Sequence, residues 1–105
     1  MKNQIFFLAL VLFNVVFSQT THIVNAGNFY FIPSVLTINQ GDEVIWVNEG
    51  GMHDVNGALN SITNEPFNNP ESFDSPSMNE LGGDIYSYQF SVPGTYNYDC
   101  SVGNH

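Results

Sequence analysis

An all-β domain, built as a sandwich or a barrel, is the fold class that this sequence predicts. After about residue 20, short runs of β-branched and aromatic residues alternate with turns rich in Gly, Pro and Asn. In that part no segment repeats its apolar residues at the 3.6-residue period of an amphipathic helix. Short strands separated by such turns are typical of antiparallel sandwiches and barrels.

The first strands are expected close to the start of this region. Residues 22–26 form a β-type run, which 30–32 continue until Pro33, a residue that cannot donate to a strand ladder. Residues 35–38 form the next apolar run, and the turn-forming sequence 39–42 ends it.

Three further features complete the predicted strands. Residues 43–48 alternate with apolar side chains on both faces, which predicts a central and well-covered strand. Residues 85–92 form a long run that ends at the turn 93–94. The strict alternation of 95–100 places three side chains on one face: Tyr96, Tyr98 and Cys100.

The stretch 56–83 interrupts this pattern. It is rich in Asn, Ser, Pro and acidic residues and shows no strand signal. We therefore expect a long variable loop, with a helical turn near 58–62.

The first 18 residues have the layout of a secretory signal peptide. Lys2 precedes an apolar run at 5–17, and the small residue Ser18 follows it. This run of about a dozen residues is shorter than the ~20 that a membrane-spanning helix needs. We expect cleavage near Ser18 and export to the periplasm or the extracellular space. An uncleaved membrane anchor is the alternative.

Cleavage would leave residues 19–105 as one strongly acidic domain. Lys2 is the only Lys or Arg, so the net charge changes from −9 to −9 − 1 = −10. Such a surface repels nucleic acid phosphates and anionic membranes, which excludes both as partners. The many aromatic side chains favour a folded rather than a disordered chain.

Three side chains are candidate metal ligands: His53, Cys100 and His105. The chain has one cysteine, so no disulfide forms within it. A thiolate with two imidazoles is the ligand set of a trigonal copper site, and zinc competes for the same groups. On spacing alone, Cys100 could equally be a core thiol, with the two histidines in solvated loops.

The wider pattern closely resembles the plastocyanin/azurin-like cupredoxins. It combines the aromatic-x-Pro sequence at 31–33, Gly41-Asp42, the strand Val44-Ile45-Trp46-Val47-Asn48 and the ligand-type His53. The second part runs from Pro93-Gly94-Thr95-Tyr96-Asn97-Tyr98-Asp99-Cys100 to His105. Four residues between Cys100 and His105 match the azurin and phytocyanin spacing better than that of plastocyanin.

The resemblance implies a Greek-key β-sandwich with one type 1 copper ion that carries single electrons. His53, Cys100 and His105 would be the equatorial ligands, and the exposed ring edge of His105 the route for the electron. The family's weak axial Met would follow the second His, and neither Met52 nor Met78 matches that position. We therefore expect the chain to be a fragment that lacks its last strand.

The resemblance and the charge together predict an exported electron carrier, not an enzyme, whose redox partner protein has a basic face. Two alternatives remain open at this stage. The same fold could bind copper for storage or delivery, or it could be a metal-free β-sandwich interaction module with Cys100 in its core.

Overall fold

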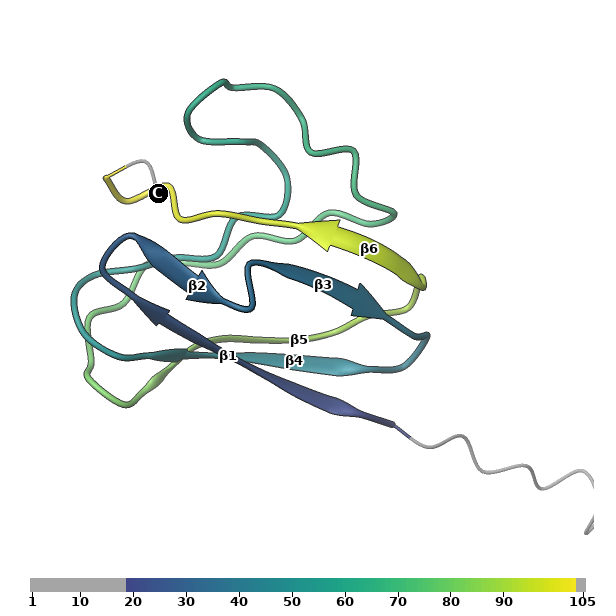
Figure 1. Ribbon diagram of the computed structural model, residues 1–105, viewed down its shortest axis with the longest axis horizontal. Helices are drawn as coiled ribbons and strands as arrows, with labels where there is room; N and C mark the ends of the chain where they lie inside the picture. The colour runs from purple at the N-terminus through teal and green to yellow at the C-terminus, as the bar shows by residue number, and fades with distance from the viewer. Residues whose placement is uncertain (1–18, 104–105) are drawn as a thin grey trace, which may run out of the picture.

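The computed structural model describes residues 19–103 and contains two packed layers of strands (Figure 1). A four-stranded sheet has the order β2-β1-β4-β5, with β1 at Thr21–Gly27, β2 at Tyr30–Ile32, β4 at Glu43–Asn48 and β5 at Asp84–Gln89. The second sheet pairs β3 (Val35–Ile38) with β6 (Gly94–Asn97). The predicted all-β sandwich is confirmed.

Two details of the strand predictions were wrong. Residues 30–32 do not continue the first strand, because the chain reverses at Phe29 (φ 64°) and β2 returns antiparallel to β1. The sheet is also not purely antiparallel, since β1 and β4 pair in parallel along their whole length. A parallel pair needs a crossover connection, and here the chain crosses through β3 in the other sheet before it returns as β4.

The core lies between the two layers and is dominated by aromatic rings. Trp46 on β4 packs edge-on against Tyr98 at a centroid distance of 5.5 Å. Phe73, which comes from the loop, lies 5.6 Å from Trp46 and 5.3 Å from Phe90. The predicted inward face of residues 95–100 is confirmed, because Tyr96, Tyr98 and Cys100 are all buried.

Strand β4 is central, as predicted, but it is covered on one face only. Val44, Trp46 and Asn48 are almost completely buried toward the core. Ile45 and Val47 point to the other face and are only partly buried, because within residues 19–103 no second layer covers that side of the four-stranded sheet. The residues alternate with apolar side chains on both faces, so the pattern alone could not show which face packs against a second layer.

The loop 56–83 contains none of the strands β1–β6, yet hydrogen bonds join it to the sandwich at many points. Gly83 accepts a backbone hydrogen bond from Asn48 of β4, and Glu71 accepts bonds from Tyr88, Ser91 and Val92. The helical turn expected near 58–62 is reduced to a single hydrogen-bonded turn at 61–63.

The same loop covers the backbone that leads from β6 to the cysteine. The side-chain amide of Asn69 binds both the N–H and the C=O of Asn97, at 2.9 and 2.7 Å. The backbone of Asn56 does the same for Asp99, at 2.8 and 2.9 Å. These polar groups, which would otherwise form an open strand edge, are therefore satisfied by the loop.

The predicted signal peptide at 1–18 lies outside the described residues. Among residues 19–103 there is no helix long and apolar enough to span a bilayer.

Candidate metal centre

The fold brings two of the three predicted ligands together at one end of the sandwich. His53 follows the turn after β4, and Cys100 follows β6 in the facing layer. The two residues are 47 positions apart, yet His53 Nδ1 lies 3.9 Å from Cys100 Sγ. Both side chains are buried, with 1% and 0% of their surface exposed. His105, the third predicted ligand, lies outside the described residues.

The imidazole of His53 is oriented by a hydrogen bond on its far side. Its Nε2 lies 2.6 Å from the carbonyl oxygen of Gly50. Because a carbonyl only accepts hydrogen bonds, Nε2 must carry the ring proton. In the neutral ring, the lone pair of Nδ1 is therefore directed toward Cys100, the state in which an imidazole binds a metal.

Asn48 and Gly51 hold the turn that supplies this carbonyl. The buried Asn48 side chain donates to Gly51 O (2.9 Å) and accepts from Gly50 N (2.9 Å). Gly51 has φ +87°, and a Cβ at this position would lie 3.2 Å from His53 Nε2. The turn therefore requires glycine for its backbone conformation, and Asn48 fixes it at the end of β4.

Cys100 sits in an apolar setting with one backbone donor. The N–H of Asp54 points to Cys100 Sγ at 3.5 Å, and Sγ lies 3.5 Å from the carbonyl oxygen of Val102. Burial raises the pKa of the Cys100 thiol, against a smaller lowering effect of the Asp54 N–H. A cation next to the sulfur would favour the thiolate, so metal binding here would release a proton.

A buried carboxylate joins the two ligand-bearing segments. Asp54 is 7% exposed and accepts hydrogen bonds from Ser101 N (2.7 Å) and from the Ser101 hydroxyl. Since Asp54 follows His53 and Ser101 follows Cys100, this contact, the Asp54–Ser101 latch, fixes the distance between the two segments. Sequence reasoning missed it, although an acceptor directly after one ligand and a donor directly after the other was a usable signal.

The other polar candidates lie elsewhere or have other partners. His22 lies on β1 beside the start of β4, at the end of the sheet away from His53, and its Nε2 is 2.9 Å from the buried Asp42. Met78 Sδ accepts a hydrogen bond from Asn48 at 3.5 Å, and Met52 is about half exposed. Within residues 19–103 no three His, Cys, Asp or Glu side chains are grouped as metal ligands.

The pair of His53 and Cys100 fits a soft or borderline metal ion. Typical bonds are about 2.0 Å to imidazole nitrogen and 2.3 Å to thiolate sulfur. The 3.9 Å separation is shorter than their sum, so one ion can contact both atoms. Imidazole nitrogen and thiolate sulfur are donors that copper and zinc prefer, whereas Mg²⁺ prefers oxygen ligands. The fold and the pair together define a β-sandwich protein with a buried imidazole and thiol suited to copper or zinc.

Comparison with known proteins gives the family. Residues 18–105 match the family of copper binding proteins described as the plastocyanin/azurin family. The chain is 31% identical over 77 residues to plastocyanin of Scenedesmus fuscus, and this alignment covers 72% of the chain and 76% of the relative. No solved structure gives a significant match. The chain belongs to the plastocyanin/azurin family of copper-binding proteins.

Proposed function

We propose that this protein is an exported type 1 copper protein that carries single electrons between partner proteins and catalyses no reaction itself. The observation that carries the proposal is the buried Cys100 Sγ, 3.9 Å from the Nδ1 of His53. His53, Cys100 and His105 are proposed as the three equatorial ligands of one copper ion. Residues 1–18 are proposed as the cleaved signal peptide and 19–105 as the copper domain.

The chain's own contribution is a site that changes little during a redox cycle. A copper ion bound there would supply a one-electron Cu(II)/Cu(I) couple with ligands that suit both oxidation states. The Gly50 carbonyl fixes the His53 ring, and the Asp54 N–H and the latch fix Cys100. Ligands that stay in place keep the reorganisation between the two oxidation states small.

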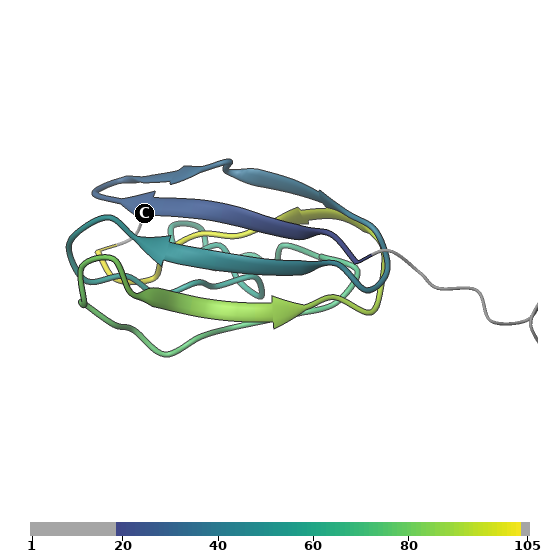
Figure 2. The ribbon, with the colours of Figure 1, turned by 90° about the horizontal axis from the view of Figure 1, so that it is seen from below.

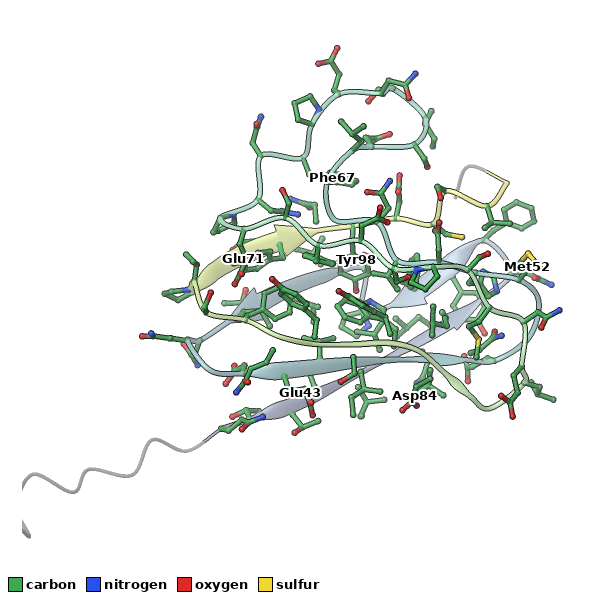
Figure 3. The ribbon with its side chains drawn as sticks, turned by 180° about the vertical axis from the view of Figure 1, so that it is seen from behind. Glu43, Met52, Phe67, Glu71, Asp84 and Tyr98 are labelled. Carbon is green, nitrogen blue, oxygen red and sulfur yellow. The ribbon has the colours of Figure 1, made fainter. Side chains whose placement is uncertain are left out.

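Partner contact is proposed at the end of the sandwich that holds these ligands. Three exposed apolar side chains occur on the neighbouring turns: Phe29 (80% exposed), Met52 (49%) and Leu81 (74%). Figure 3 shows Met52 at this end of the molecule. The turns are adjacent, since Gly82 donates to Asn48 and Asn28 lies against Gly51. Close contact here would shorten the path between copper and the redox centre of a partner with a basic face.

The visible spectrum of the purified protein with Cu(II) tests the metal site. We expect an intense thiolate-to-copper charge-transfer band, which Cys100→Ser removes because a hydroxyl is a harder and more basic ligand. His105→Ala should remove it as well, whereas Met52→Leu, an exposed change at the same end, should keep it. Copper binding by the wild-type protein without such a band would refute the ligand assignment.

Voltammetry then separates an electron carrier from a storage or delivery protein. A carrier should give a reversible one-electron wave and should retain its copper through repeated cycles. Copper loss upon reduction, without a reversible wave, would favour storage or delivery by the same fold. Mass spectrometry of the exported protein tests cleavage near Ser18.

A further inference from the structure

The outer face of the four-stranded sheet has a composition that the copper site does not explain. Figure 2 looks onto this face, with β2, β1, β4 and β5 side by side and no second layer from the described part of the chain in front of them. A solvated sheet face usually carries polar side chains. Here its centre is apolar: Ile23 is 51% exposed, Ile32 is 61% exposed, and Ile45 and Val47 are partly exposed.

The strand register shows how these four side chains are arranged on the face. Ile23 on β1 lies directly opposite Ile45 on β4. Asn25, two residues further on β1, faces both Val47 and Ile32. Ile23, Ile45 and Val47 therefore form one continuous apolar area across β1 and β4, and Ile32 on β2 lies beyond Asn25 at its border. We term these four side chains the outer-face patch. A continuous apolar area marks a contact site more often than scattered single residues do.

Carboxylates border the outer-face patch, and neutral groups hold two of them. Glu43 accepts a hydrogen bond from the Ser87 hydroxyl (3.1 Å), and Glu49 accepts one from Tyr30 (2.7 Å). Asp84 is exposed beside Val47. Figure 3 shows Glu43 and Asp84 along the same outer side of the sheet.

No fixed positive charge neutralises these acids within residues 19–103, since the only Lys or Arg of the sequence is Lys2. These carboxylates are therefore available to pair with basic side chains of a protein that binds the outer-face patch.

We propose that the outer-face patch is a docking site for a protein surface with an apolar centre ringed by Lys and Arg. The apolar side chains of the patch would be buried against the apolar centre of the partner, and the carboxylates around the patch would pair with the partner's Lys and Arg. A second copy of this chain is a poor occupant, because its own patch would bring carboxylates against carboxylates. This contact lies on the side of the sheet and leaves the end with His53 and Cys100 accessible. The protein can therefore be held by one partner while that end remains open to another.

Binding to a basic c-type cytochrome tests the proposal, because the exposed haem edge of such a protein is apolar and ringed by lysines. The metal-free, ¹⁵N-labelled protein is titrated with the cytochrome at low and high salt. We expect amide shifts at Ile23, Ile45 and Val47, and weaker binding as salt screens the charges.

The double variant Ile23→Thr/Ile32→Thr keeps β-branched side chains and should weaken binding at least about fivefold. Two matched variants remove an exposed apolar side chain elsewhere: Ile62→Thr on the loop and Leu81→Thr at the ligand-bearing end. Ile62→Thr should change the affinity less than about twofold, and Leu81→Thr reports any separate contact at that end.

Two results would overturn the proposal: no binding of the cytochrome, or an unchanged affinity in a double variant whose amide spectrum shows a native fold. Replacing Glu43 and Asp84 by their amides should reduce the salt dependence, and an unaltered salt dependence would remove the charged border from the interface. The experiment uses metal-free protein, so a negative result leaves the copper proposal standing, and failure of the copper proposal leaves this test valid.

Discussion

Removing the carboxylate of the Asp54–Ser101 latch is the change with the clearest expected magnitude. Asp54 is 93% buried and accepts two hydrogen bonds from Ser101. A hydrogen bond to a charged group contributes about 1.5–3 kcal/mol. Ser101 is exposed, so water can replace part of the hydrogen bonding that its N–H and hydroxyl lose when the Asp54 carboxylate is removed. For Asp54→Ala we therefore expect a loss of about 2–3 kcal/mol in the free energy of unfolding.

Two milder variants set the scale for this loss. Ser101→Ala removes only the hydroxyl bond and should cost about 1 kcal/mol. Asp54→Asn keeps one acceptor for the Ser101 N–H and should cost less than Asp54→Ala. Combining Asp54→Ala with Ser101→Ala should add little to the single alanine change at 54, because the two residues share the same contact.

Urea denaturation of the metal-free protein measures these differences, with the fluorescence of Trp46, the only tryptophan, as the probe. The exposed Glu65 provides a control, since Glu65→Ala also removes one negative charge but should stay within about 0.5 kcal/mol of the wild type. A cost below about 1 kcal/mol for Asp54→Ala would refute the latch as a stabilising contact. With copper present, the same variant should lower metal affinity about tenfold or more, as the loss of a group that orients a ligand does.

Three further perturbations have defined outcomes. The hydrogen bond from His22 lowers the pKa of Asp42 below its usual 3.8, with help from the backbone N–H groups of Asn39 and Thr20 and against the raising effect of burial. The stabilisation from Asp42 is therefore present above pH 3.8 and lost as the pH falls through its lower folded-state pKa. Urea midpoints measured from pH 2 to 7 should show this loss, and Asp42→Asn should reduce the dependence of the midpoint on pH. Gly51→Ala forces a side chain into φ +87° and should weaken copper binding and cost about 1–2 kcal/mol in urea unfolding; unchanged copper affinity would show that the turn does not position His53. Asn69→Ala removes the two bonds to Asn97, so hydrogen exchange of the Asn97 amide should become at least about tenfold faster.

Local patterns in the sequence predicted much of the fold. The alternation of 95–100 predicted the inward face of its strand, because side chains on a strand point to opposite sides in turn, and the apolar run 43–48 predicted a central strand. The chain reversal at Phe29 was not predicted, because a non-glycine residue with positive φ leaves little signal in the sequence. Local patterns could not predict that β1 pairs in parallel with β4 or that one face of β4 is uncovered, because both features depend on tertiary packing.

The candidate site divides in the same way. Residue type and spacing made His53 and Cys100 candidates, and the resemblance to the cupredoxins selected them as ligands; the structure brings their side chains to 3.9 Å. Their orientation depends on Asn48, Gly51 and Asp54, whose roles come from hydrogen bonds across turns and between layers. The sequence pattern predicts Asn48 as part of the strand that leads to the site, but it does not predict these hydrogen bonds. The role of His105 stays a prediction.

The long sequence separation of His53 and Cys100 couples metal binding to folding of the whole domain. An unfolded chain would have to close a loop of 47 residues before the two side chains could share an ion, so it offers no preformed chelate. An ion held by both would therefore bind the native state far better than the unfolded one. Copper at a hundred times its dissociation constant would then raise the free energy of unfolding by about 2.7 kcal/mol. Such an ion would act as a removable cross-link between the two layers, in a chain whose one cysteine cannot form an internal disulfide.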